Sequence, residues 1–396
     1  MNVLPYVLLA SGLVACSEVM ALYEWQDQDS QGNARILLRA FSVATEQGND
    51  TDETAGGLAR LHLQNKYKSG IGYELNIYQT LMDKSLAGSQ SNALSGGVER
   101  SGYFEWSLSD TEYAHLAIDQ MSFYVRGEQY NIGIGRQAIN LAATFFFMPN
   151  DFFAPFSAQT FYRIYKPGVD SLSVEWSPGE LDSVSFFTVA GYTKSDKTDS
   201  GWSEGVDSRR NSYLLRYLNN YAGFEWGLIA GKVRRERIIG GSLTGELFGW
   251  LGVRVEGHQA EEIDYPANRF NMLSIGLEHR WQNSLMLQIE QFYNGSGVIT
   301  PSTYDFAKPY PARRYQALGL SYELTPLLNG QISIIRNQID GSLLYNLNGI
   351  YSLSDESELS FSLSMPGHIS HDDDYSEQRE FSRYPDTISL EIRSYY

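Results

Sequence analysis

Cysteine is nearly absent from this sequence of 396 residues, and the one cysteine, Cys16, lies close to the amino terminus. A disulfide framework and a cysteine-based metal site are therefore excluded. A chain that carries no other thiol suits an oxidising compartment, where stray cysteines would pair wrongly.

Long apolar runs are also missing. After residue 21 no stretch is long and apolar enough to cross a bilayer as a helix, which excludes a helical membrane protein. A β-barrel remains possible, because its strands place apolar residues only at every second position. The chain has 27 tyrosines and 19 phenylalanines, and tyrosine suits surfaces with one apolar and one wet end.

An excess of basic residues is lacking as well. The formal net charge is −17, which argues against a nucleic-acid-binding protein, since such proteins are basic. Two interpretations of the acidic excess are open. We favour acidic, soluble loops, because much of the acid lies in predicted loops; the alternative is a lumen that favours cations.

Enzyme motifs are absent too. The sequence holds no His-Glu-x-x-His pair and no Gly-x-Ser-x-Gly in a strand-to-helix context, and its 6 histidines show no triad spacing. We therefore expect no enzymatic activity, no cofactor and no metal centre. His371–Asp374 could hold calcium or bridge to lipopolysaccharide through divalent cations, but a solvated acidic loop is the preferred interpretation.

The amino-terminal segment is typical of a signal peptide. Residues 3–20 are mostly apolar and small, and residues 19–21 (VMA) form a small-x-small cleavage site. We predict a signal peptide over residues 1–21, cleaved after Ala21, and one domain over residues 22–396. An alternative stays open, because residues 13–16 (LVAC) resemble a lipoprotein box, which would lipidate Cys16.

From residue 34 onward, apolar residues recur with period two. In Leu359–Met365 every odd residue is apolar and every even residue is serine, as in a strand with one apolar and one wet face. Short polar turns, such as 68–70, alternate along the chain with longer polar segments, such as 83–112. Barrels of bacterial outer membranes have this arrangement, with short periplasmic turns and longer outer loops.

These patterns predict an all-β fold, namely a transmembrane antiparallel up-and-down β-barrel of about 18 strands in the outer membrane of a Gram-negative cell. The even count places both termini on the periplasmic side. Residues 223–259 could hold two long strands instead of three, and the even count favours three. The predicted strands span residues 33–45, 57–68, 71–82, 113–126, 130–139, 168–177, 183–193, 211–219, 223–235, 237–246, 250–259, 270–281, 284–295, 313–324, 330–339, 342–354, 357–366 and 386–396.

The last predicted strand adds an independent signal. It carries Ile388, Leu390, Ile392 and Tyr396 on one face and ends on an aromatic residue. This pattern resembles the carboxy-terminal signature that the outer-membrane barrel assembly machinery reads. Pairing of this strand with the first one would remove both edges of the sheet.

One region resembles known outer-membrane proteins. A strand ending in GRQ (135–137), a loop rich in proline, aspartate and phenylalanine (149–156) and a strand opening with PGVD (167–170) are similar to those of porin-like proteobacterial proteins. The alginate-export family, similar in style, has a comparable GRQ strand. The resemblance covers about residues 130–176 and implies an outer-membrane channel, without implying alginate as cargo.

Alternation also assigns side chains to the wet face, which lines the lumen of a barrel. These side chains carry mixed charges, and two interpretations are open. Acidic and basic ladders could face each other across a pore and set up a transverse field, or the charges could pair and stiffen the wall. The predicted pore-lining residues are Arg35, Arg39, Arg60, Glu74, Arg216, Arg254, Glu256, Glu278, Arg280 and Glu290.

Arg136 is a special case, because alternation from Ile132 and Ile134 places it on the lipid-facing side near the rim. It would either extend its head to the interface or be turned inward by a bulge. The following segment, 145–156, is long and apolar. We favour a loop that folds into the barrel as a constriction, and the alternative is an aromatic collar on the rim. The predicted constriction residues are Phe147, Asp151, Phe152 and Phe153.

Together these features predict an outer-membrane, porin-like channel for the diffusion of small polar or charged solutes. The expected partners are outer-membrane lipid, lipopolysaccharide, the barrel assembly machinery and the solutes, but no nucleic acid. Two other functions stay open: an export conduit that works with periplasmic partners, and an outer-membrane interaction or adhesion protein.

Overall fold

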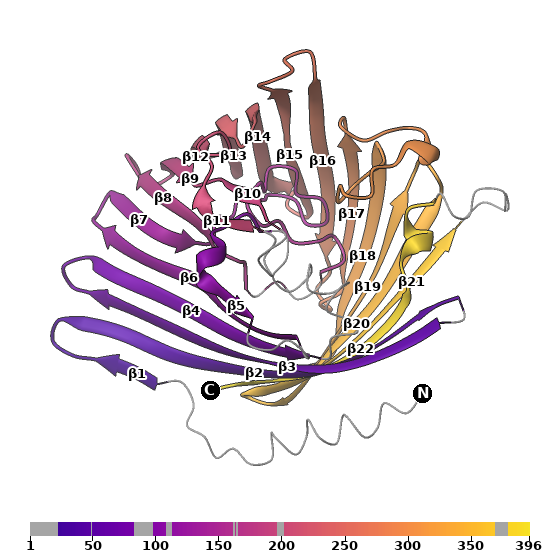
Figure 1. The fold of residues 1–396 in the computed structure, drawn as a ribbon, viewed down its shortest axis with the longest axis horizontal. Helices are drawn as coiled ribbons and strands as arrows, with labels where there is room; N and C mark the ends of the chain where they lie inside the picture. Colours follow the sequence, from indigo (N-terminus) through magenta and orange to yellow (C-terminus); the bar gives the residue numbers. More distant parts are fainter. Residues whose placement is uncertain are drawn as a thin grey trace.

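The computed structural model describes residues 23–48, 50–82, 98–107, 113–160, 163, 165–195, 202–368 and 379–396. Eighteen antiparallel strands form a closed barrel in which each barrel strand pairs with the next. Figure 1 follows this ring from the first strands in indigo to the last in yellow. The barrel strands are β2 (Ser30–Gln47), β3 (Asp50–Tyr67), β4 (Ile71–Met82), β6 (Tyr113–Arg126), β7 (Tyr130–Gln137), β8 (Val169–Trp176), β9 (Asp182–Val189), β12 (Ser212–Tyr221), β13 (Phe224–Val233), β14 (Glu236–Leu247), β15 (Leu251–Glu262), β16 (Arg269–Arg280), β17 (Met286–Asn294), β18 (Arg314–Thr325), β19 (Leu328–Asn337), β20 (Ser342–Ser354), β21 (Ser357–His368) and β22 (Asp386–Tyr395).

The first and last barrel strands pair with each other. Residues 37–46 of β2 lie antiparallel to residues 386–395 of β22, and the two strands are neighbours in Figure 1. Ile36 and Tyr396 add a reciprocal pair of backbone hydrogen bonds of 2.6 and 2.7 Å. This pairing joins both edges of the sheet, so the predicted closure is confirmed and the edge backbone groups have partners.

The stretch 223–259 holds three strands, as the even count predicted. β13 and β14 pair across the tight turn Arg234–Arg235, and β14 and β15 pair across Phe248–Trp250. Arg234 and Phe248 have positive φ values of 51° and 57°. This left-handed conformation lets very short turns reverse the chain.

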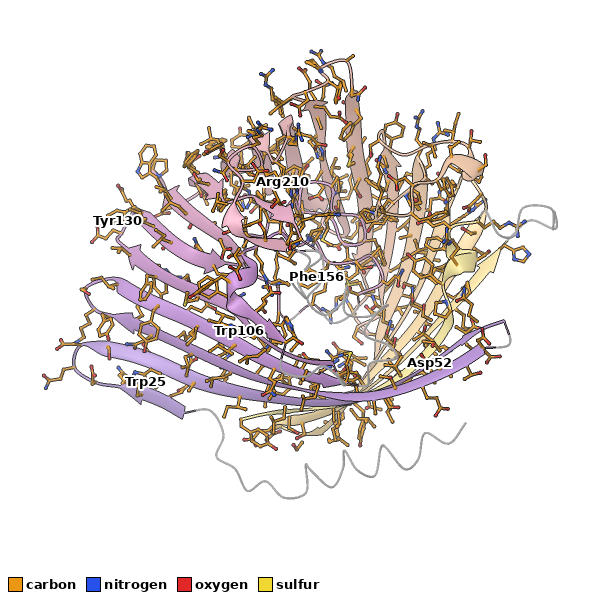
Figure 2. The ribbon with its side chains drawn as sticks, viewed as in Figure 1. Trp25, Asp52, Trp106, Tyr130, Phe156 and Arg210 are labelled. Carbon is orange, nitrogen blue, oxygen red and sulfur yellow. The ribbon has the colours of Figure 1, made fainter. Side chains whose placement is uncertain are left out.

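All connections at one end of the barrel are short, whereas the other end has long connections and a few tight turns, such as 234–235 and 338–341. At the short-turn end, connections such as 68–70 and 222–223 are brief, and β2 begins and β22 ends there. At the long-loop end, connections such as 138–168 and 295–313 are long. Figure 2 labels Trp25 at the short-turn end of the first hairpin and Asp52 at its long-loop end. The predicted alternation of short and long connections is confirmed.

Short elements that alternation did not predict accompany the barrel. β1 (Tyr23–Gln26) lies beside the start of β2, and β5 (Glu105–Ser107) pairs with β6. β10 (Tyr192–Lys194) and β11 (Trp202–Val206) form a separate hairpin. Among the described residues, 3-10 helices lie in long connections: η1 (Gly102–Phe104), η2 (Pro301–Thr303) and η4 (Phe381–Arg383). Within the described part of the chain, no helix has the length and apolarity to span a membrane.

Alternation gives the barrel an apolar outer face. Leu228 and Ile239 expose 63% and 64% of their surface, whereas their neighbours Ile229 and Ile238 are buried on the inner side. Exposed aromatic side chains gather near the short-turn end, where a membrane–water interface would favour their amphipathic rings. They include Tyr67, Tyr130, Trp176, Tyr221, Phe248, Trp250, Trp281 and Tyr351.

β7 ends at Gln137, earlier than the predicted residue 139, and the chain then leaves the wall. Gly135 near its end has a φ of +124°. A Cβ built on Gly135 would lie 2.2 Å from the Met121 carbonyl oxygen of β6. Only glycine fits both this backbone conformation and this close approach of two strands.

We expect Gly135→Val to lower the free energy of unfolding of the barrel by about 2 kcal/mol or more, because the added atoms would collide with the β6 backbone. The variant should therefore unfold at a lower temperature than the wild type. The measurement is the temperature at which the folded band disappears in SDS electrophoresis. Gly349→Ala is the control, since the nearest atom to its Cβ would be 4.0 Å away. Equal transition temperatures for the two variants would contradict the role of Gly135.

Candidate functional site within the barrel

Residues 138–168 connect β7 to β8, and we call them the inserted segment. The segment lies inside the ring of strands, where Figure 2 labels its Phe156. Its backbone N–H groups donate to Glu256 and Glu290, which face inward from the wall. The segment is therefore folded into the barrel and is not a collar on the rim.

Glu290 on β17 holds the start of the inserted segment. Its carboxylate accepts the backbone N–H groups of Phe145, Phe146 and Phe147 at 2.9, 3.0 and 2.6 Å. The Ser274 hydroxyl donates to the same carboxylate at 2.9 Å. Glu290 is 3% exposed, so these donors replace water around a buried charge, which such burial requires.

Glu256 on β15 holds the segment at two further points. Its carboxylate accepts the backbone N–H of Ala143 and, at 3.4 Å, that of Asn150. The Asn150 side chain donates to the Gly241 carbonyl at 2.9 Å, and its Oδ1 lies 3.0 Å from Nδ1 of His258. Two wall strands thus fix both sides of the turn that residues 143–150 form.

Aromatic side chains pack the segment against the wall. The Phe147 ring stacks on Phe292, with centroids 5.1 Å apart and planes at 13°, and contacts the rings of Tyr310 and Tyr315. Phe146 belongs to the same buried cluster. Of the predicted constriction residues, Phe147, Asp151 and Phe153 are buried and only Phe152 keeps part of its surface exposed. Most of them therefore anchor the segment.

Asp151 is a buried carboxylate within the segment, and its ion-pair partner is Lys166 near the segment's end. Burial raises the pKa of the Asp151 carboxyl, while the Lys166 ammonium opposes that rise. The pair ties the middle of the segment to its end, so that residues 151 and 166 lie close together.

Arg60 on β3 belongs to a buried charge cluster. Its guanidinium donates to Asn76 at 2.8 Å and to Asp119 at 2.7 Å. Arg100 donates to the other oxygen of Asp119 at 2.8 Å. The Tyr165 ring of the inserted segment lies 4.4 Å from the Arg60 guanidinium. This predicted pore-lining residue thus supports the segment's far end.

Arg136 fills the place in the wall that β7 leaves. It donates to the Asp170 carboxylate at 2.8 Å and to the carbonyls of Ile118 and Ser101 at 2.9 and 2.8 Å. The Phe104 ring lies 5.0 Å from its guanidinium, and the residue is only 2% exposed. Arg136 therefore does not extend to an interface, but is buried in the wall.

The remaining predicted pore-lining residues keep part of their surface exposed. Arg35 is exposed, and Arg216 donates to the Asn140 carbonyl of the inserted segment at 3.4 Å. Three of the others form ion pairs between strands along the wall, namely Arg39–Glu391, Arg254–Glu278 and Arg280–Glu323, at 2.6 to 3.0 Å. Glu74 lies within hydrogen-bond distance of His62, at 2.9 Å.

Another buried carboxylate, Glu99, organises the long-loop end. It accepts Nε of Arg210 at 2.7 Å, Nε of Arg234 at 2.6 Å and the Tyr192 backbone N–H at 2.9 Å. Burial alone would raise the pKa of Glu99, but the two guanidiniums hold it below its usual value. The connections around β9, β12 and β13 therefore meet at one charged centre.

Sequence reasoning missed several of these residues: Glu99, Arg100, Asp119 and Glu380. For Asp119 a signal existed, because the apolar alternation slips by one position between Ile118 and Met121. The structure has a register shift at this point of the β4–β6 pairing, and the extra residue is Asp119. The other three lie in or beside long connections, where period-two alternation carries no information.

His371–Asp374, the segment considered for calcium, lies outside the described residues. Among the residues that the structure describes, no group of three or more histidine, cysteine, aspartate or glutamate side chains could hold a metal ion.

Glu380 is a buried carboxyl at the long-loop end that ties the connection before β22 to the wall. It accepts the Tyr315 hydroxyl at 2.7 Å and the Asn337 side-chain amide at 2.8 Å, and its own N–H donates to Asp340 at 2.8 Å. Burial, reinforced by the Asp340 carboxylate, raises the pKa of Glu380 to about 8. The adjacent Phe381 packs in the aromatic cluster that holds the inserted segment.

Comparison with known proteins shows the fold. No family model and no curated protein sequence matches the chain, so the resemblance to the alginate-export family stays a prediction. OccAB3 of Acinetobacter baumannii has 11% identity and a TM-score of 0.60, with 92% of this chain and 99% of that chain covered. OpdL of Pseudomonas aeruginosa has 12% identity and a TM-score of 0.59, with 92% and 98% covered.

Glu290→Gln tests how the inserted segment is held. An amide has one acceptor oxygen and no charge, so the hydrogen bonds to residues 145–147 should weaken by about 2 kcal/mol in total or more. We expect protease cleavage within residues 141–166 to become faster while the barrel stays folded. Glu323→Gln is the control, because its carboxylate pairs with Arg280 away from the segment. Equal cleavage rates in both variants would contradict the anchoring role.

Glu380 should make the long-loop end sensitive to pH. The folded protein keeps the Glu380 proton up to about pH 8, whereas an ordinary glutamic acid loses it near pH 4.5. Stability from this group is therefore complete below pH 4.5 and falls as the pH rises toward 8. We expect hydrogen exchange of residues 381–384, corrected for intrinsic rates, to be faster at pH 8.5 than at pH 5. In Glu380→Gln the difference should vanish; a wild type better protected at pH 8.5 would contradict the assignment.

Proposed function

We propose that this chain is an outer-membrane channel through which small polar or charged solutes diffuse. The observation that carries the proposal is the inserted segment, which buried carboxylates hold inside an eighteen-stranded barrel while charged side chains of the inner wall stay exposed beside it. A barrel with an apolar outer face and a polar inner face suits a bilayer and gives solutes a wet path through it.

The outer surface supports the membrane location. Leu228, Ile239 and their neighbours expose apolar side chains along the wall, and exposed aromatic residues gather near the short-turn end. The long-loop end would face the outside and the short-turn end the periplasm. The predicted signal peptide over residues 1–21, the barrel assembly machinery and lipopolysaccharide are parts of this proposal.

In this mechanism the inserted segment narrows the passage and the exposed charges set the solute preference. Glu256 and Glu290 position the segment, and Arg60 supports it through Tyr165. Arg35 and Arg216 are the candidates for contact with passing solutes, because both keep exposed surface on the inner wall. Ion pairs such as Arg254–Glu278 keep the wall rigid around them.

Single-channel recording of the purified full chain in planar bilayers tests the proposed function. We expect stepwise currents that grow with salt concentration, because a water-filled passage conducts ions. Glu290→Gln should add current fluctuations, since it loosens the segment that narrows the passage. A correctly folded barrel that carries no current would overturn the proposal.

Arg35→Glu tests whether the exposed inner-wall charges set selectivity. The change replaces a positive by a negative charge beside the passage, so the reversal potential in a salt gradient should shift toward cations, with a permeability ratio changed about twofold. Lys68→Glu is the matched control, because Lys68 is an exposed residue of the turn between β3 and β4. The same shift in both variants, or in neither, would contradict a lining role for Arg35.

A further inference from the structure

Basic side chains gather on the outer face of the barrel at the long-loop end of β13–β19. This is unexpected in a chain with a net charge of −17. We call the group the basic rim, and it consists of Lys232, Arg235, Arg237, Arg269, Arg314 and Arg336.

Strand pairing places three of the six residues in one lateral row. Lys232 lies opposite Arg237, Arg237 opposite Glu261, and Glu261 opposite Arg269. The row faces outward, because the next residue of β14, Ile238, is buried on the inner side. Ile239, two positions from Arg237, exposes 64% of its surface on the same outer face. The row therefore borders directly on the apolar surface.

Arg314 and Arg336 share the outer face with glutamine side chains. Arg336 on β19 lies opposite Gln316 on β18. The Gln291 amide donates to Gln338 at 3.1 Å on the same face. Arg314 is exposed two residues from Gln316. The Gln316 amide, which lies on this outer face, can donate hydrogen bonds to an anion that the two guanidiniums attract.

Two carboxylates, Glu261 and Asp264, pair with residues of the rim. Because the rim has six basic residues, it keeps a positive net charge. Glu261 bridges Arg269 at 2.7 Å and Arg237 at 3.7 Å. Asp264 pairs with Arg235. Arg237 and Arg269 nevertheless keep 68% and 62% of their side-chain surface exposed. A bridged guanidinium is held in place and still offers N–H groups to a second anion.

We propose that the basic rim binds the phosphate groups of lipopolysaccharide in the leaflet at the long-loop end. The inference rests on the outer-membrane location proposed above. The rim lies between the apolar surface and the loops, which is the depth of lipid headgroups in a bilayer. Guanidinium groups match phosphate with two parallel N–H donors, and each basic residue near an anionic leaflet strengthens the attraction.

The binding would be confined to one side of the barrel. On β2 and β3 the outward-facing residues at the same end include Glu46 and Glu53, both exposed. Carboxylates at this position repel phosphate. The charge pattern therefore orients lipopolysaccharide toward β13–β19.

Native mass spectrometry of the full chain in detergent tests the rim, with diphosphorylated lipid A as the probe. Two variants remove charge from it, Arg314→Gln with Arg336→Gln, and Arg237→Gln with Arg269→Gln. We expect each to bind the lipid about thirtyfold more weakly. The matched control is Lys68→Gln with Arg126→Gln, which removes two basic residues at the short-turn end and should bind like the wild type.

Two further probes identify the source of the phosphate. Lipid A without its phosphates should bind weakly to the wild type, and inorganic phosphate at the same concentration should not displace the intact lipid. Equal binding of the dephosphorylated lipid, full displacement by inorganic phosphate, or unchanged affinity of both rim variants would each overturn the proposal.

The outcome is separable from that of the channel proposal. The rim variants should give the single-channel currents of the wild type, because the changed residues face away from the inner wall. A chain that binds the lipid through the rim but carries no current would refute the channel alone. A chain that conducts but shows no loss of lipid binding in the rim variants would refute the rim alone.

Discussion

Backbone groups that are buried away from water must find hydrogen-bond partners, and this constraint governs the chain inside the barrel. Strand residues meet it through the closed ladder, but the inserted segment has no ladder to join. Glu256 and Glu290 take that role, since together they accept five backbone N–H groups of the segment. The course of the inserted segment therefore depends on two carboxylates that lie on different wall strands.

The same constraint acts where β7 ends and the chain leaves the wall. The carbonyl groups of β6 that no longer face β7 would lack hydrogen-bond partners. Different parts of the chain supply donors to them. Arg136 donates to the Ile118 carbonyl at 2.9 Å, and the Gly168 N–H donates to the Asp119 carbonyl at 3.1 Å. β5 pairs with the next residues along β6. A segment can enter the barrel only because side chains and neighbouring loops complete the wall behind it.

Period-two alternation and turn parity predicted the barrel well, because both follow from each strand having one apolar and one wet face. β4, β6 and β20 have the predicted bounds. The site was less predictable, since its anchors act through contacts between distant residues. Glu290 was assigned to the inner face, but nothing in the sequence indicated that it would accept the N–H groups of residues 145–147. Asp119 and Arg136 lie where a bulge and a missing strand break the alternation, so a face assigned by counting does not hold there.

Alternation places arginines on both faces of the wall, and their partners differ according to the surroundings. Arg60 lies buried on the inner face, where Asp119 and Asn76 accept its N–H groups, as a cation without access to water requires. Arg314 and Arg336 lie on the outer face near glutamine amides. Each guanidinium has five N–H groups, so water or an anion of the membrane must accept the remaining hydrogen bonds. The net charge of −17 hides this division, because it sums over faces that meet different surroundings. What the barrel attracts depends on the position of each charge relative to the wall, and the sum says little about it.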